Sequence, residues 1–200
     1  MAALIGLVAC GGKSSRMDTD KCLLEYHGQP QWNYIYKLVQ PFCEKVLISC
    51  NKSQIDLFPS SVKYITDKEE YLNIGPMASL LSAFADYPTH DFLLVGCDYP
   101  FLDQKHVRQL FNSRNGNKKA FAFYNRIHNI YEPLLAIYKN ECYKLIYEHF
   151  QKKEYSLCYL LEEISAAKVT PESEKAILSV DDRAGFNIAL NELKLLSFGK

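Results

Sequence analysis

Short apolar runs recur along the chain, and segments with helical spacing lie between them. Residues 91–97 (DFLLVGC) form the strongest run, and residues 4–8 (LIGLV) form the first. A short run without polar alternation is typical of a strand buried on both faces of a sheet. We predict four further strands, over residues 45–50, 62–66, 119–124 and 134–138.

Apolar residues three and four positions apart predict helices between these strands. The spacing occurs around residues 34–42, 107–111, 157–164 and 186–193. Strands that alternate with helices are typical of an α/β fold, in which helices cover both faces of a mostly parallel sheet. Ligands bind such sheets at the carboxyl ends of the strands, so the residues that follow each strand are the first candidates for chemistry.

The bulk composition fits one globular domain over residues 1–200. The chain is 48% hydrophobic, which allows a sizeable core, and its formal net charge of zero provides no basic field for nucleic acid. No apolar run reaches the ~18 residues of a transmembrane helix. The N-terminus enters the first strand without the basic region of a signal peptide.

The cysteines indicate a reducing compartment. There are seven, with no Cys-x-x-Cys pair, and several lie inside apolar runs. This usage favours free thiols over a disulfide framework or a zinc site. We therefore expect a cytoplasmic protein that binds neither nucleic acid nor membranes.

The segment after the first strand combines glycines, hydroxyls and cations. Gly11 and Gly12 open it, two serines follow, and Arg16 and Lys21 supply positive charge. Glycine backbones and cations of this kind suit a polyphosphate, and arginine can bind its oxygens in a bidentate manner. The alternative is an ordinary turn with solvated basic residues. The spacing matches neither the dinucleotide fingerprint nor a Walker loop.

Asp98 lies at the end of the strongest strand, shortly before Pro100. A carboxylate beside a triphosphate is a natural ligand of Mg²⁺, which prefers one or two carboxylates together with phosphate oxygens and water. The alternative is a carboxylate that stabilises a turn or caps a helix. The position of Asp98 at a strand end makes the metal site our preferred interpretation.

Other strand ends carry weaker candidates. Ser49 and Asn51 suit a ribose or a base, and suit an ordinary turn equally well. Asp67 is by itself typical of a solvated loop. Asp181 and Asp182 either complete a metal site or cap the helix that follows them. The five histidines are scattered and indicate no catalytic triad.

Two further segments precede regular elements. Residues 73–81 (NIGPMASLL) predict a helix start, because Pro76 suits the first helical position, and this start either faces a ligand or is a plain junction. Residues 125–133 precede a late strand and are a candidate acceptor surface. Arg126 in that segment either meets an anionic acceptor or is a solvated loop charge.

These motifs resemble the molybdenum cofactor guanylyltransferases, a family of the nucleotidyltransferase superfamily, over essentially the whole chain. Residues 11–17 with 20–24 form the first motif and residues 97–100 (CDYP) the third; both are shared by many nucleotidyltransferases. The second motif, Asp67 followed by residues 75–78 (GPMA), is the discriminating one. The fourth is Val180-Asp181.

The resemblance implies a three-layer Rossmann-like nucleotidyltransferase fold and transfer of GMP from GTP to molybdopterin, with release of pyrophosphate. We assign catalysis to Arg16, Lys21 and Asp98, and the Mg²⁺ site to Asp98 with help from Asp181. Transient contact with molybdenum-cofactor proteins is a further expectation. The residues assigned to the nucleotide are Ala9, Cys10, Gly11, Gly12, Lys21, Ser49, Asn51, Asp67 and Asp98.

The chain departs from the family pattern at several of these positions. Ala9-Cys10 stands where Leu-Ala is usual, and Asp18 stands where glycine is common. Ser49 and Asp181 replace asparagines, and Asn51 is a substitute for the contact at Ser49.

Three alternatives remain open. In the first, the base of the nucleotide is cytosine instead of guanine. In the second, the acceptor is a small phosphate other than molybdopterin. In the third, the chain is a nucleotide-binding module without catalysis. The pair Gly11-Gly12 favours guanine, since the related cytidylyltransferases usually carry Ala-Ala-Gly there.

Overall fold

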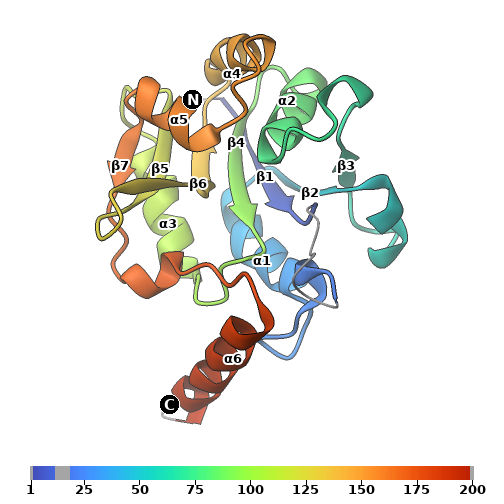
Figure 1. Cartoon of the computed structure of the whole chain (residues 1–200), viewed down its shortest axis with the longest axis vertical. Coiled ribbons are helices and arrows are strands. Elements are labelled where there is room, and N and C mark those ends of the chain that lie inside the picture. Colours follow the sequence, from blue (N-terminus) through green and yellow to red (C-terminus); the bar gives the residue numbers. More distant parts are fainter. Residues whose placement is uncertain (1, 12–18, 199–200) are drawn as a thin grey trace.

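The structure is a computed structural model, and it describes residues 2–11 and 19–198. Within them, seven strands form one sheet in the order β3-β2-β1-β4-β6-β5-β7 (Figure 1). Strand β6 runs antiparallel to β4 and β5, and the other neighbouring pairs are parallel. The strands are β1 (Leu4–Ala9), β2 (Lys45–Cys50), β3 (Tyr64–Thr66), β4 (Asp91–Gly96), β5 (Ala120–Asn125), β6 (Ile130–Tyr138) and β7 (Ala167–Val169).

Helices cover both faces of this sheet, which confirms the predicted three-layer α/β fold. Helices α2, α4 and α5 pack on one face through a core that includes Phe84 and Phe92, whereas α1 and α3 pack on the other through Ile35 and Leu110. The α-helices are α1 (Gln31–Val39), α2 (Pro76–Asp86), α3 (Gln104–Ser113), α4 (Cys142–Gln151), α5 (Leu157–Glu163) and α6 (Arg183–Phe198). The 3-10 helices are η1 (Lys21–Leu23), η2 (Gln40–Phe42), η3 (Lys52–Leu57), η4 (Glu69–Tyr71) and η5 (Glu174–Ile177).

The central strands explain why the apolar runs are continuous. Alternate residues of β1 face opposite cores, since Ile5 and Leu7 join one core while Leu4 and Val8 join the other. Gly6 lets helix α1 approach closely: a Cβ at that position would lie 3.1 Å from Val39 Cγ2. Both faces of the strand are therefore buried, as the run predicted.

Several element boundaries differ from the prediction. Strand β6 begins at Ile130, four residues before the predicted start, because its first residues pair with the end of β5 rather than with β4. Strand β3 is shorter than predicted. Helix α4 and strand β7 were not predicted. Strand β7 has only three residues, and its pairing with β5 is what stabilises it.

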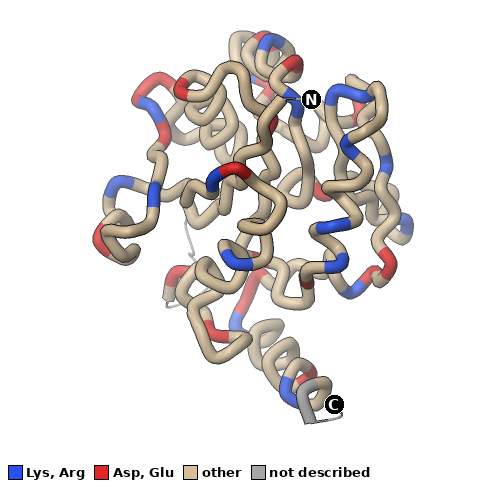
Figure 2. Tube along the Cα trace, turned by 180° about the vertical axis from the view of Figure 1, so that it is seen from behind, with Lys and Arg blue, Asp and Glu red and all other residues tan. Residues whose placement is uncertain are grey.

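Helix α6 extends from one end of the molecule (Figure 1). Its Phe186 and Ala189 pack on Leu24, Tyr26 and Val180. Lysines and arginines are interspersed with acidic residues along the trace (Figure 2). Over the described residues, no helix is both long and apolar enough to cross a membrane.

Candidate functional site

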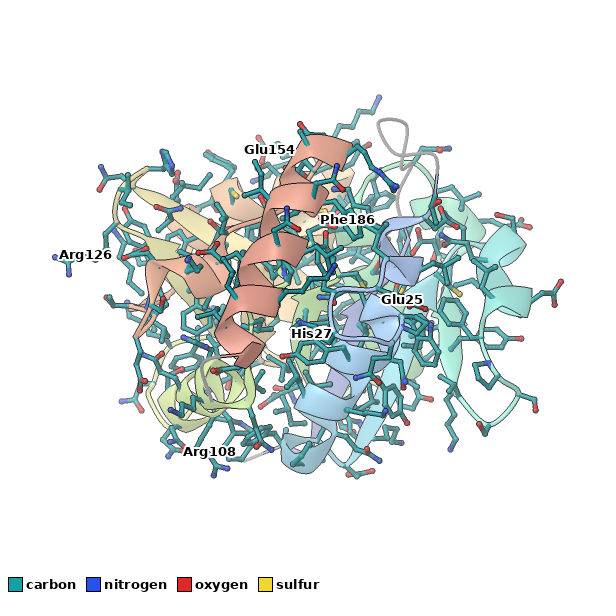
Figure 3. All side chains as sticks on the ribbon, turned by 90° about the horizontal axis from the view of Figure 1, so that it is seen from below. Glu25, His27, Arg108, Arg126, Glu154 and Phe186 are labelled. Atoms are coloured by element: carbon teal, nitrogen blue, oxygen red, sulfur yellow. The ribbon has the colours of Figure 1, made fainter. Side chains whose placement is uncertain are left out.

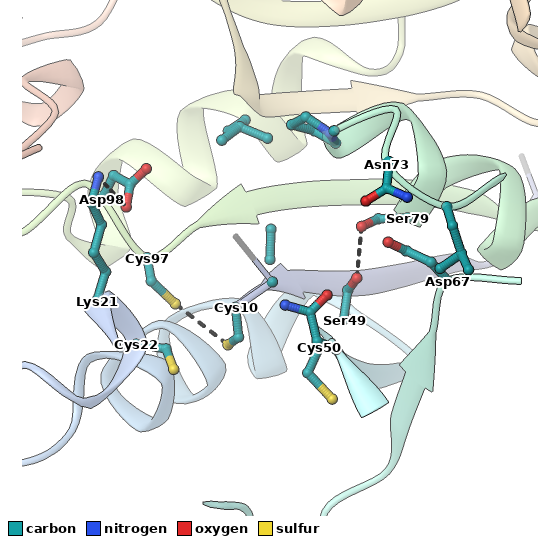
Figure 4. A pocket seen from close by; sticks show the side chains of 17 residues that line it. Cys10, Lys21, Cys22, Ser49, Cys50, Asp67, Asn73, Ser79, Cys97 and Asp98 are labelled. Carbon is teal, nitrogen blue, oxygen red and sulfur yellow. Dashed lines mark hydrogen bonds and ion pairs between the residues drawn. The ribbon is translucent and has the colours of Figure 1, made fainter. Parts of the chain in front are cut away.

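A cavity of about 680 Å³ opens at the carboxyl ends of β1, β2 and β4 (Figure 4). This volume lies in the range that holds a small-molecule ligand. The predicted site residues that line it are Ala9, Cys10, Gly11, Lys21, Ser49, Asn51, Asp67 and Asp98. Gly12, Arg16 and Asp18, which the prediction also named, lie outside the described residues.

The end of β1 is tied to the end of β2 by two backbone hydrogen bonds. The amides of Cys10 and Gly11 donate to the Ser49 carbonyl at 2.8 and 3.1 Å. The Gly11 N–H therefore already has a partner inside the protein. The sequence had suggested instead that this N–H is directed at a phosphate. Gly11 itself is exposed at the cavity, and a Cβ there would lie 3.7 Å from Asn51 Oδ1, an ordinary contact.

Lys21 joins the two acidic residues that were predicted to bind metal. Its Nζ lies 2.6 Å from Asp181 Oδ1 and 3.4 Å from Asp98 Oδ1. Burial lowers the pKa of Lys21, but the two carboxylates more than offset this effect, so that the net shift of its pKa is upward. Burial raises the pKa of Asp98, and the nearby Lys21 only partly opposes the increase.

The structure separates the roles of Asp181 and Asp182. Asp182 is the helix cap, since the Gly185 amide donates to its Oδ1 at 2.8 Å. Asp181 instead faces Lys21. A backbone hydrogen bond of 2.8 Å from the Val180 amide to the Asp98 carbonyl holds this segment against the end of β4.

The opposite end of the cavity contains a chain of hydroxyls and a carboxylate. Ser49 is buried, and its hydroxyl donates to Ser79 Oγ at 2.7 Å. Burial raises the pKa of Asp67, and the Ser79 hydroxyl partly counteracts this increase. Asn51 caps η3 through its side chain, in a capping box with Gln54. Ser49 and Asn51 therefore line the cavity with side chains that already have partners.

Helix α2 begins at the cavity wall. Gly75 adopts φ +66° and ψ −151°, a conformation essentially restricted to glycine, and Pro76 takes the first helical position. Ser79 follows within the first turn and was missed by the sequence analysis. The signal was its place as a polar residue in an otherwise apolar helix face.

A second missed group lies beside Asp98. The buried Tyr99 donates its hydroxyl to Glu132 Oε2 at 3.0 Å. This bond connects the end of β4 to the start of β6, in the segment suggested as an acceptor surface. Arg126 of that segment is exposed and points outward at the periphery (Figure 3), away from the residues that line the cavity.

The donors present fit a magnesium ion that is completed by substrate. Asp98 and Asp181 offer hard carboxylate oxygens on either side of the Lys21 ammonium group. Mg²⁺ commonly takes one or two carboxylates together with phosphate oxygens. Across residues 2–11 and 19–198, no group of three or more His, Cys, Asp and Glu side chains is arranged to hold a metal by itself.

The chain is similar to several known proteins. Residues 6–167 match the family described as the MobA-like NTP transferase domain. A molybdenum cofactor biosynthesis bifunctional protein of Synechocystis sp. is 35% identical over 136 residues, which are 68% of this chain and 39% of that protein. The chain thus spans about two fifths of that relative. A probable molybdenum cofactor guanylyltransferase of Flavobacterium johnsoniae is 24% identical over 190 residues, covering 94% of this chain and 91% of that protein.

Solved structures share the fold. Molybdopterin-guanine dinucleotide biosynthesis protein A from Archaeoglobus fulgidus superimposes with a TM-score of 0.78 at 16% identity, over 96% of this chain and 99% of that one. A nucleotidyl transferase from Methanothermobacter thermautotroptrophicus gives a TM-score of 0.76 at 12% identity, over 97% and 99% of the two chains. At these identities the likeness shows the fold alone.

Proposed function

Because the chain belongs to the MobA-like NTP transferase domain family and is therefore a nucleotidyltransferase, we propose that it transfers GMP from GTP to molybdopterin and releases pyrophosphate. The observation that carries the proposal is the grouping of Lys21 and Asp98, which line a cavity of ligand size, with Asp181, which contacts Lys21. The guanylyltransferase names of the relatives support this choice of substrates.

The reaction needs positioning and charge neutralisation more than proton transfer. The terminal phosphate of molybdopterin attacks the α-phosphorus of GTP in line, and pyrophosphate leaves. The nucleophile is already an anion, so no general base is required. Lys21, with Arg16, offsets the negative charge that develops on the α-phosphate and the leaving group.

Asp98 and Asp181 would hold Mg²⁺, which when bound neutralises phosphate oxygens. Lys21 has a second role in the free protein, since its ammonium group lies between the two carboxylates and reduces their repulsion.

The nucleoside end of the substrate would lie near Asp67 and Ser79. A half-buried carboxylate there would accept hydrogen bonds from base N–H groups or ribose hydroxyls, and the Ser79 hydroxyl partly opposes the rise in its pKa that burial causes. The partners assigned from the resemblance, including transient contact with molybdenum-cofactor proteins, belong to this proposal. So do the single domain over residues 1–200 and the cytoplasmic location.

A thermal-shift screen tests the nucleotide. GTP, CTP, ATP and UTP are added separately, with and without Mg²⁺, and pyrophosphate release is then measured with molybdopterin as acceptor. A Mg²⁺-dependent shift with GTP, followed by release, supports the proposal. A larger shift with CTP would assign the cytidylyl reaction instead. No shift with any nucleotide would refute a nucleotide site.

A further inference from the structure

Four of the seven cysteines gather around the cavity, and the proposed reaction uses none of their thiols. Cys10, Cys22, Cys50 and Cys97 all line it and are all buried, and each is a free thiol (Figure 4). The sulfur atoms of Cys10 and Cys97 lie 3.6 Å apart. The other cysteines, Cys43, Cys142 and Cys158, do not line the cavity.

The backbone around Cys10 and Cys97 suits a covalent bond between them. They directly follow Ala9 and Gly96, which are register partners in the neighbouring parallel strands β1 and β4. Neighbouring strands lie ~4.8 Å apart, within the ~4.4–6.8 Å that separates the Cα atoms of bridged cysteines. The two sulfur atoms need to approach by roughly 1.5 Å to reach the bonded distance of ~2.05 Å.

We propose that Cys10 and Cys97 form an oxidation site for small peroxides, and that closing the disulfide between them weakens nucleotide binding. One thiol gives up its proton and its sulfur attacks hydrogen peroxide, so that an S–O bond forms and the O–O bond breaks. The sulfur is thereby oxidised to a sulfenic acid, and the departing hydroxide takes the proton and leaves as water. The second thiol attacks that sulfur, the S–S bond forms and a second water leaves. Two thiols lose two electrons in total, and one peroxide accepts them.

The position of the pair in the chain connects its oxidation to the site. Cys10 immediately precedes Gly11, and Cys97 immediately precedes Asp98. The backbone at Cys10 is bonded to Ser49, and that at Asp98 is bonded to Val180. Drawing the two sulfur atoms together therefore displaces Gly11 relative to the Asp98 carboxylate. Burial raises the pKa of Cys10, so the reactive thiolate is scarce at neutral pH and oxidation is slow.

Mass spectrometry of the whole protein tests the site directly. After treatment with hydrogen peroxide, we expect the intact mass to fall by two hydrogen atoms and digestion to yield one linked peptide pair containing Cys10 and Cys97. Dithiothreitol reverses both changes, and saturating GTP with Mg²⁺ slows them. Cys97→Ser and Cys10→Ser remove the linked pair, whereas the control Cys158→Ala retains it. Two single variants guard against the misfolding of either one.

The binding consequence is measured by titrating reduced and oxidised protein with GTP and Mg²⁺. We expect the affinity to fall by roughly tenfold on oxidation, because a ~1 Å displacement of a positioned group is costly. A bridge to Cys22 or Cys50, no bridge at all, or an unchanged affinity would overturn the proposal. Reduced protein without affinity for GTP would instead refute the proposed function, while the peptide map still decides whether the dithiol closes.

Discussion

Replacing Asp98 by asparagine separates the chemistry of the site from the stability of the fold. The substitution keeps the shape of the side chain and removes its charge. Asp98 is 26% exposed and lies 3.4 Å from Lys21, which keeps its closer contact of 2.6 Å with Asp181. The backbone carbonyl of residue 98, which accepts the Val180 amide, is unchanged.

The expected change in unfolding free energy is small. A partly exposed ion pair contributes about 0–1 kcal/mol. Burial raises the folded-state pKa of Asp98 above its ordinary value of 3.8, so at neutral pH the folded protein holds this charge less favourably than the unfolded chain does. The asparagine removes that cost, which offsets the lost attraction to Lys21.

The expected change in turnover is large. Without the charge of Asp98, Asp181 is the one remaining carboxylate of the two that contact Lys21. The site therefore keeps only half of the negative charge that would bind a metal ion. The loss of a metal-dependent contribution of about 4 kcal/mol lowers turnover by roughly 10³-fold.

Pyrophosphate release with GTP, Mg²⁺ and molybdopterin measures the turnover, and thermal unfolding measures stability. The matched control is Asp182→Asn, a carboxylate-to-amide change one residue from Asp181 whose side-chain oxygen still caps α6. This control is expected to retain both activity and stability. Turnover of Asp98→Asn within tenfold of the unmodified protein would refute the role assigned to Asp98.

Three further predictions concern charge, burial and backbone conformation. Ionised Asp98 is needed for metal-dependent binding, so the affinity for GTP with Mg²⁺ should fall as the pH drops through the raised pKa of Asp98. Asp181→Asn removes a like charge that raises this pKa, so the loss of affinity should move to lower pH; an unchanged pH profile would contradict the coupling. Arg114 is buried, and its Nη2 lies 3.0 Å from Asp91 Oδ2. Asp91→Asn leaves this charge without its carboxylate and should lower the free energy of unfolding, measured in urea, by about 3–5 kcal/mol; a loss below about 1 kcal/mol would show that the pair is not needed. Gly75→Ala should cost about 1–3 kcal/mol in the same assay, because φ +66° with ψ −151° is essentially restricted to glycine. The cost is conformational, since among the described residues no atom beyond the two chain neighbours lies within 4 Å of the added Cβ; unchanged stability would mean that the turn relaxes.

The strand ends that carry the site were predictable because the strands themselves are local features. Continuous apolar runs indicated strands buried on both faces, and β1 and β4 have that environment. Since ligands bind parallel sheets at the carboxyl ends of strands, Lys21 and Asp98 could be selected as candidates without coordinates. The structure places both of them at one cavity.

Side-chain partnerships were not predictable, because they depend on contacts between distant parts of the chain. The sequence alone left open whether Asp181 and Asp182 complete a metal site or cap α6, and it suggested a free amide at Gly11. The amide is in fact bonded to Ser49, 38 positions away by residue number. Ser79 and Glu132 acquired roles only through packing.

The sequence by itself therefore determined the layered α/β fold and the strand ends at which a ligand can bind. The reason is that burial patterns and turn residues are properties of short, continuous segments of the chain. Only the tertiary structure decided that Lys21 meets a carboxylate 160 positions away and that the sulfur atoms of Cys10 and Cys97 lie 3.6 Å apart. The physical reason is that such contacts follow from the register of β1 against β4 and from the docking of the segment before α6. Neither property is encoded in local periodicity.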